Sequence, residues 1–174
     1  MKKHDQDSEE PAVTPVAPRL LMIDDDAVMR RSAGRFLSRA GFHVVSTDSG
    51  EAALHRLRSG EQFDVLVVDM QMPTMSGLEV LEAVAREFPT VPAGLWSASA
   101  TLADMTPRDR ANAAFVVPKM SPISDLVEAA CQAAAGVRTE PAELPKDRAW
   151  GLSTGVRRRD GKVVQLAIGR KKLA

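Results

Sequence analysis

The sequence predicts a doubly wound α/β fold, in which a parallel sheet carries helices on both faces. Strand-like and helix-like segments alternate five times between residues 20 and 136. Val65 to Val68 is a continuous apolar run rich in β-branched residues, which is typical of a strand buried on both faces of a parallel sheet. The segments that follow the strands, such as Ile123 to Ala134, instead place apolar residues at helical spacing. These three observations favour the doubly wound class.

The elements can be assigned in order along the chain. The first strand is Leu20 to Ile23, and a helix from Met29 to Ala40 follows it and ends at Gly41. The later predicted elements are a strand Phe42–Val45, a helix Gly50–Arg58, a strand Val65–Val68, a helix over 78–88, a strand Pro92–Trp96, a helix Pro107–Ala114, a strand Phe115–Val117 and a helix Ile123–Ala134.

Length and composition restrict the class of protein. With 174 residues, 44% of them hydrophobic and 26% charged, the chain suits one globular domain with tails. No apolar stretch approaches the ~20 residues of a membrane helix, and Met1 to Glu10 lacks the apolar region of a secretory signal. The single Cys131 excludes an intramolecular disulfide framework, and we expect it to be buried and inert. We therefore expect a cytoplasmic protein with no membrane contact.

Charge is divided unevenly along a chain whose formal net charge is zero. Residues 1–18 contain three prolines among small and charged residues and are predicted to be a disordered leader. Residues 20–136 carry ten basic and fifteen acidic side chains, whereas residues 137–174 carry ten basic and four acidic ones. We therefore predict a folded domain over 19–136, followed by a linker and basic extension over 137–174.

The basic extension has two cationic blocks, Arg157–Arg159 and Arg170–Lys172, around a β-prone run. A β-hairpin is predicted over Val156 to Ile168, with Asp160-Gly161 as its turn. The extension is either a solvated tail or a docking element that binds the acidic domain, an acidic partner or nucleic acid. Among the docking alternatives, we favour binding to the chain's own domain over nucleic acid.

The candidate site residues lie just past the ends of the predicted strands: Asp24, Asp25, Asp69, Ser97 and Lys119. In an open parallel sheet these positions share one edge, where ligands bind. Carboxylates at ~4 Å repel one another by about 4 kcal/mol per pair in a partly polar setting. Mg²⁺, which prefers oxygen ligands, would remove this repulsion and would assist a carboxylate nucleophile toward a phosphoryl group. Lys119 and Ser97 would then donate to the phosphoryl oxygens.

These residues resemble the receiver domain of response regulators in two-component signalling, of the stand-alone, chemotaxis-regulator-like kind. The resemblance covers about residues 19–136. The matching segments are Leu21–Asp26, which is similar to the first strand and acidic pair, Asp69–Gly77, which has the form Asp-x-x-Met-Pro-x-x-x-Gly, and Pro92–Ala98, which is similar to the fourth strand.

The resemblance implies a flavodoxin-like sheet of five parallel strands in the order 2-1-3-4-5, and it implies a role for each site residue. Asp69 would be the phosphoacceptor, assisted by Lys119 and Ser97, with Asp24 and Asp25 as the acid pocket. Mg²⁺ would bind Asp25, Asp69 and the backbone carbonyl of Gln71, and Asp24 through water. Ser97 and Phe115 would form the switch.

The implied function is signalling rather than enzymatic turnover. A histidine kinase or phosphotransfer protein would supply the phosphoryl group to Asp69, and a changed surface would then bind an unidentified downstream protein. Four features depart from the family pattern. Lys119 lies between Pro118 and Met120 instead of preceding a proline, Phe115 is one residue out of step, Gly94 is expected to weaken its strand, and Pro107 is expected to delay or distort the fourth helix.

Two other functions remain open. Asp24 and Asp26 after an apolar strand also fit the first motif of haloacid-dehalogenase-like phosphatases, with Asp24 as nucleophile and Asp26 as acid/base. Asp26 has a simpler interpretation, which is to cap the first helix. The second alternative is a receiver-like scaffold that is never phosphorylated.

Overall fold

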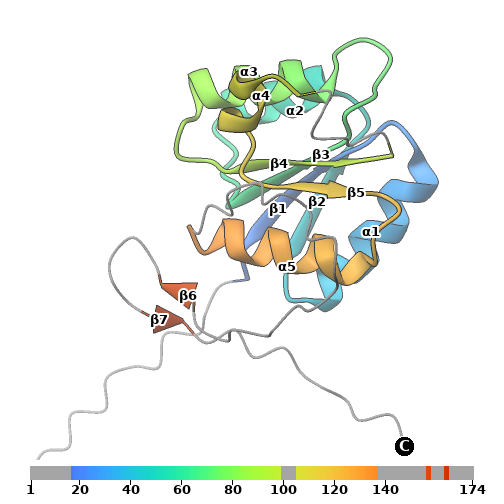
Figure 1. The fold of residues 1–174 in the computed structure, drawn as a ribbon, viewed down its shortest axis with the longest axis vertical. Coiled ribbons are helices and arrows are strands. Elements are labelled where there is room, and N and C mark those ends of the chain that lie inside the picture. The colour runs from blue at the N-terminus through green and yellow to red at the C-terminus, as the bar shows by residue number, and fades with distance from the viewer. Residues whose placement is uncertain (1–16, 99–104, 137–155, 158–162, 165–174) are drawn as a thin grey trace, which may run out of the picture.

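Five parallel strands form one sheet in the order β2-β1-β3-β4-β5, which confirms the predicted fold class and strand order (Figure 1). The structure is a computed structural model, and it describes residues 17–98 and 105–136 together with two short strands at 156–157 and 163–164. The sheet strands are β1 (Arg19–Ile23), β2 (His43–Thr47), β3 (Val65–Val68), β4 (Ala93–Ser97) and β5 (Val116–Pro118).

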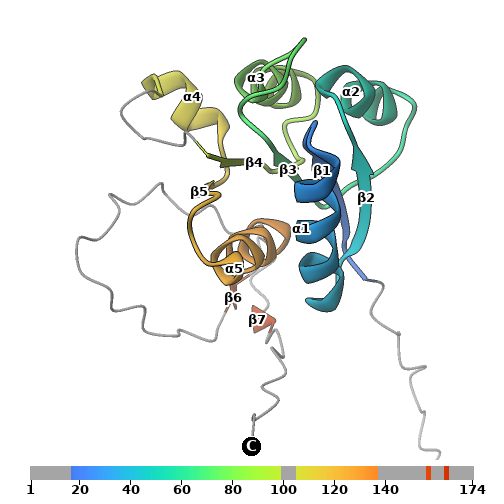
Figure 2. The same cartoon turned by 90° about the vertical axis from the view of Figure 1, so that its right-hand side faces the viewer.

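Helices cover both faces of this sheet, as Figures 1 and 2 show from two directions. One face carries α2 (Gly50–Arg58), α3 (Gly77–Glu87) and α4 (Pro107–Asn112), and the other carries α1 (Ala27–Arg39) and α5 (Ile123–Ala134). Each face has its own buried apolar cluster. Within the central strand β3, Leu66 and Val68 belong to the α2/α3 cluster, while Val65 and Val67 belong to the α1/α5 cluster.

Side-chain caps fix where the helices begin. Asp26 Oδ1 accepts hydrogen bonds from the backbone N–H groups of Val28 and Met29 at 2.7 and 3.2 Å, so α1 begins two residues earlier than its apolar periodicity predicts. Thr106 and Asp109 form a capping box at the start of α4. Pro107 follows that cap at the first helical position. The N–H group at this position has no partner within a helix, so its absence in proline costs no hydrogen bond.

Gly94 accommodates an aromatic ring from the neighbouring strand. A Cβ atom at Gly94 would lie 2.4 Å from three carbons of the Phe115 ring, and Phe115 is itself buried. The expectation that Gly94 leaves a packing weakness in β4 is therefore wrong, because the Phe115 ring fills the space that a side chain would occupy.

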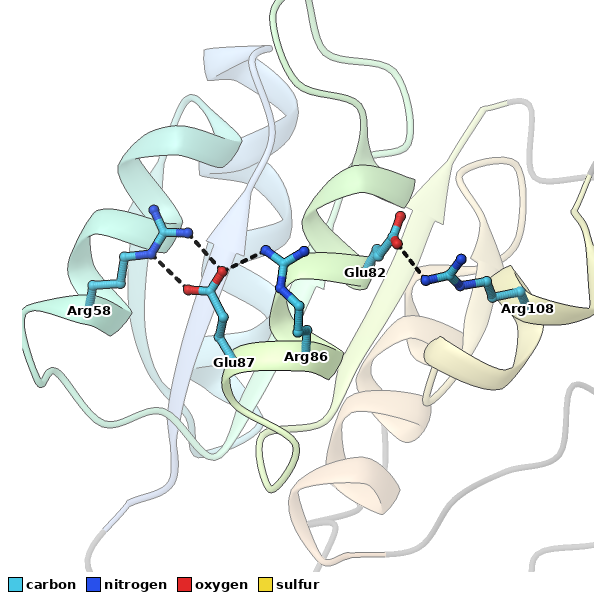
Figure 3. Close-up of polar contacts among 5 residues, drawn as sticks. All are labelled: Arg58, Glu82, Arg86, Glu87 and Arg108. Atoms are coloured by element: carbon cyan, nitrogen blue, oxygen red, sulfur yellow. Dashed lines mark hydrogen bonds and ion pairs between the residues drawn. The ribbon is translucent and has the colours of Figure 1, made fainter.

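Ion pairs join the three helices that cover one face (Figure 3). Arg58 of α2 makes two contacts with Glu87 of α3, at 2.8 and 2.9 Å, and Arg108 of α4 contacts Glu82 of α3 at 2.6 Å. Arg58 and then Arg86 lower the pKa of Glu87 to about 2. Exposed pairs of this kind typically contribute about 0.2–1 kcal/mol each, so burial dominates the stability of this layer.

The C-terminal extension is described only at two short strands. β6 (Val156–Arg157) and β7 (Val163–Val164) pair antiparallel, with Val156 opposite Val164. These strands fall within the predicted hairpin, whereas its Asp160-Gly161 turn, the remainder of the cationic blocks and the predicted leader up to residue 16 lie outside the described residues. Among the described residues, every helix is too short or too polar to cross a membrane.

The packing of Phe115 over Gly94 predicts opposite effects for two glycine-to-alanine changes. Gly94→Ala should destabilise the protein by about 1–3 kcal/mol, because the new methyl group overlaps the ring. The control is Gly34→Ala in α1, where the nearest atom would be Val44 Cγ1 at 3.7 Å. It should be neutral or stabilising by about 0.5–1 kcal/mol. Urea unfolding measures both changes, and equal stability of the two variants would contradict the packing described.

Candidate functional site

The site forms where adjacent strands end at the same edge of the sheet. Ile23 at the end of β1 pairs with Val68 at the end of β3, and the Asp69 N–H donates to the Ile23 carbonyl at 2.8 Å. Asp24 and Asp69 are the first residues after the ends of β1 and β3, and they therefore lie beside each other. On the other side of β3, the Lys119 N–H donates to the Ser97 carbonyl at 2.9 Å and extends the β4–β5 ladder.

Lys119 bridges the two buried carboxylates. Its Nζ lies 2.9 Å from Asp24 Oδ2 and 3.0 Å from Asp69 Oδ2. Asp24 is fully buried, and the Asp69 and Lys119 side chains are only 8% and 12% exposed. The structure thus brings together Asp24, Asp69 and Lys119, as the positions after the strands predict, and places buried Ser97 at the same edge.

Asp25 completes a cluster of three carboxylates. One oxygen from each of Asp24, Asp25 and Asp69 lies within 4.8 Å of the others, with Asp25 exposed to solvent. Gln71 follows in the loop after β3, and its N–H donates weakly to Asp69 Oδ1 at 3.4 Å. Because the donors are carboxylate oxygens with one open side, the cluster fits a divalent cation that keeps part of its water shell.

Burial and charge act in opposite directions on this cluster. Burial raises the pKa of Asp24 above its ordinary value of 3.8, although hydrogen bonding to Lys119 opposes the rise. Burial alone would lower the pKa of Lys119, but its hydrogen bonds to Asp24 and Asp69 raise the pKa above the ordinary value of 10.5. Lys119 is therefore a cation at neutral pH and partly balances the two buried acids.

The backbone around the carboxylates is also held in place. Asp24 Oδ1 accepts from the Asp26 N–H at 2.8 Å, and the Arg30 guanidinium donates to the Asp24 carbonyl. In the loop after β3, a Cβ atom at Gly77 would lie 2.3 Å from the Asp69 carbonyl oxygen, so only glycine fits there. The Arg30 contact was not expected from sequence, because the arginine lies among several others on α1.

Phe115, the second residue of the expected switch, lies apart from the carboxylates. Phe115 precedes β5, and its ring packs over Gly94, three residues before Ser97, in the α1/α5 cluster. Its role as a switch therefore remains a prediction. Cys131 is only partly buried in α5, and burial raises the pKa of its thiol; that it is inert remains a prediction.

Comparison with known proteins gives a consistent result. The family model of the response regulator receiver domain matches residues 20–131. Two-component response regulator ARR10 of Arabidopsis thaliana is 38% identical over 74 residues, which cover 42% of this chain and 13% of that protein. A cyclic di-GMP phosphodiesterase of Thermotoga maritima is 34% identical over 71 residues, covering 41% of this chain and 18% of that one. The matched regions are thus a small part of these curated relatives.

Solved structures show the same fold. The signal receiver domain of the response regulator NarL from Mycobacterium tuberculosis has a TM-score of 0.58 and 29% identity, covering 70% of this chain and 99% of that one. The response regulator TrrA from Thermotoga maritima, in complex with Mg²⁺-BeF, has a TM-score of 0.61 and 26% identity, covering 67% and 98%. Together with the family match, these findings show that the chain belongs to the response regulator receiver domains of two-component systems.

The raised pKa of Asp24 predicts a stability difference that depends on pH. The unfolded carboxyl ionises near 3.8, whereas the folded one ionises at higher pH, so the folded protein loses stability as pH rises between these values. Without Mg²⁺, Asp24→Asn should therefore be more stable than wild type at pH 7, because the variant buries no charge at this position. The difference should disappear below the pKa of the unfolded carboxyl.

Urea unfolding at several pH values measures this difference. The matched control is Glu128→Gln, which removes an exposed carboxylate from α5 and should change stability little at any pH. A loss of stability in Asp24→Asn at pH 7 would show instead that the ion pair with Lys119 outweighs the cost of burying the charge.

Proposed function

We propose that this receiver domain accepts a phosphoryl group on Asp69 from a histidine kinase or phosphotransfer protein, in a step that depends on Mg²⁺. The carboxylate of Asp69 at the edge of the sheet, 3.0 Å from the Lys119 ammonium and within reach of two further carboxylates, is the observation that supports this assignment most strongly. Receiver domains bind Mg²⁺ at such an acidic pocket, and the related TrrA structure contains Mg²⁺-BeF.

The reaction requires little from the protein beyond position and charge. A carboxylate oxygen of Asp69 attacks the phosphorus of the phosphohistidine on the donor protein, and an O–P bond forms. The bond between phosphorus and the histidine nitrogen breaks, and its electron pair stays on that nitrogen. Lys119 donates to a phosphoryl oxygen in place of its hydrogen bond to the unmodified Asp69 carboxylate. Ser97 supplies a neutral hydroxyl donor from the neighbouring strand end.

The metal would be held by Asp25 and Asp69, by the Gln71 carbonyl, and by Asp24 through water. When bound, Mg²⁺ neutralises charge on the incoming phosphoryl oxygens and on the carboxylates. Asp25 suits the role of direct ligand because it is exposed, whereas Asp24 is already held by Lys119 and the Asp26 N–H.

The phosphatase alternative is disfavoured by the position of Asp26. In that mechanism Asp26 would be the general acid, but its carboxylate caps α1 through Val28 and Met29, and those hydrogen bonds lower its pKa. A group with a lowered pKa is a poor proton donor at neutral pH. We therefore propose that the chain is a signalling module rather than an enzyme.

The remaining parts of the proposal concern partners and location. The phosphorylated form would present a changed surface to a downstream protein, in the cytoplasm. An unphosphorylated receiver-like scaffold is the second candidate, supported by the Pro118-Lys119-Met120 sequence and by the packing of the Phe115 ring over Gly94. The basic extension would be a solvated tail or a docking element, and among the docking targets we favour the domain itself over nucleic acid.

The first test of this proposal is the site of labelling. After incubation with acetyl phosphate and Mg²⁺, intact-mass spectrometry should show one added phosphoryl group that hydroxylamine removes, and Asp69→Asn should show none. Asp26→Asn is the matched control, since it leaves the cluster intact and should still be labelled. Labelling of Asp69→Asn would overturn the assignment, and turnover of p-nitrophenyl phosphate by wild type would favour the phosphatase.

Metal binding provides a separate test. Asp25→Ala should reduce Mg²⁺ affinity by at least about tenfold, because one charged ligand is lost, and Asp24→Ala should reduce it less. Isothermal titration calorimetry measures both affinities, with Glu128→Gln as a control that should bind like wild type. If the double variant of Asp24 and Asp25 bound Mg²⁺ as tightly as wild type, the metal would lie elsewhere.

A further inference from the structure

Lys119 has a neighbour at the site that the sequence analysis did not single out. Its Nζ lies 5.2 Å from the centre of the Trp96 ring, in addition to the carboxylates at 2.9 and 3.0 Å. Trp96 is 4% exposed, so its ring excludes water from that side of the ammonium. A cation over an indole face is attracted by the negative charge of the ring surface, and this attraction increases where water is excluded.

The sheet register explains why these two side chains meet. Trp96 in β4 pairs with Val117 in β5, and both belong to the buried cluster under α1 and α5. Lys119 continues the ladder through its N–H to the Ser97 carbonyl. Since alternate residues of a strand share a face, Lys119 lies on the same face as Val117 and Trp96. The position of the ring is therefore set by the core rather than by a loop.

A fixed ring beside Lys119 matters because lysine is a flexible side chain that can place its charge at many points. In the structure described, Asp24 and Asp69 hold the ammonium between them. A divalent cation would offset the charge of both carboxylates, and a phosphoryl group would offset that of Asp69. Either change would weaken the attraction between the carboxylates and the Lys119 ammonium. The attraction of the Trp96 ring does not depend on the charge of either carboxylate.

We propose that Trp96 is a positioning residue, whose indole holds the Lys119 ammonium beside Asp69 so that it meets the oxygens of an arriving phosphoryl group. This inference rests on the proposed phosphoryl transfer to Asp69. The contact between ring and ammonium is present in the unphosphorylated protein, however, and can be tested without any transfer reaction.

The contact is tested first by NMR of protein labelled with ¹³C at the lysine ε-carbons, with the Lys119 signal assigned through Lys119→Arg. Protons above an indole face shift upfield, so the Lys119 signal should lie upfield of the other lysines. The displacement should vanish in Trp96→Leu and persist in part in Trp96→Phe. A Lys119 signal that coincides with the other lysines, or that is unchanged in Trp96→Leu, would overturn the proposal.

The functional consequence is tested by the rate of labelling with acetyl phosphate at saturating Mg²⁺. Trp96→Leu should slow labelling by about 3- to 30-fold, the range expected for a desolvated cation–π contact, while Mg²⁺ affinity changes less than about twofold. Trp96→Phe should recover most of the rate, because it keeps an aromatic face. Leu95→Val is the matched control, since Leu95 is equally buried in β4 but belongs to the α2/α3 cluster.

A double-variant comparison separates positioning from general damage to the fold. In a Lys119→Met background, Trp96→Leu should have no further effect on labelling, because the group that it positions is gone. An equal further loss in that background, or no recovery by Trp96→Phe, would show that Trp96 acts only through packing. If wild type itself is never labelled, the proposed transfer fails, and the lysine NMR signal still decides whether the ring holds Lys119.

Discussion

The ion pair of Lys119 with two buried carboxylates is the interaction on which this end of the molecule depends. Asp24 and Asp69 follow the adjacent interior strands β1 and β3, where apolar packing on both faces excludes water from their side chains. Two like charges in such a place repel strongly, and each loses hydration. The Lys119 ammonium, within 3.0 Å of both carboxylates, offsets part of this repulsion and of the lost hydration.

This arrangement also makes the site ready for chemistry. Carboxylates that are already dehydrated and held in fixed positions by β1 and β3 need little reorganisation when a cation or a phosphoryl group arrives. Under the proposed transfer, Lys119 would have two roles at different times, as the counter-ion of Asp24 and Asp69 before transfer and as a partner of phosphoryl oxygens afterwards. Under the same proposal, the raised pKa of buried Asp24 would be a consequence of its place in the acid pocket.

The strand order and the position of the carboxylate cluster could be predicted from the sequence, because they follow from local apolar patterns, from the family resemblance and from the geometry of parallel sheets. The bounds predicted for residues 65–68 and 123–134 agree with the structure, since the first segment is a continuous apolar run and the second has a clear helical apolar period. The convergence of Asp24, Asp69 and Lys119 follows from their positions just past the ends of parallel strands. The contacts of Trp96 with Lys119 and of Phe115 with Gly94 could not be predicted, because they depend on the register between β4 and β5.

The most direct test of the central claim is to locate the phosphoryl group chemically. After treatment with acetyl phosphate and Mg²⁺, borohydride reduction converts an aspartyl phosphate into homoserine, which peptide mass spectrometry can assign to one position. The account predicts homoserine in place of Asp69 and unmodified aspartate at positions 24, 25 and 26. Homoserine at position 24 would contradict it and would favour the phosphatase-like nucleophile, and the absence of any reduced residue would favour an unphosphorylated scaffold.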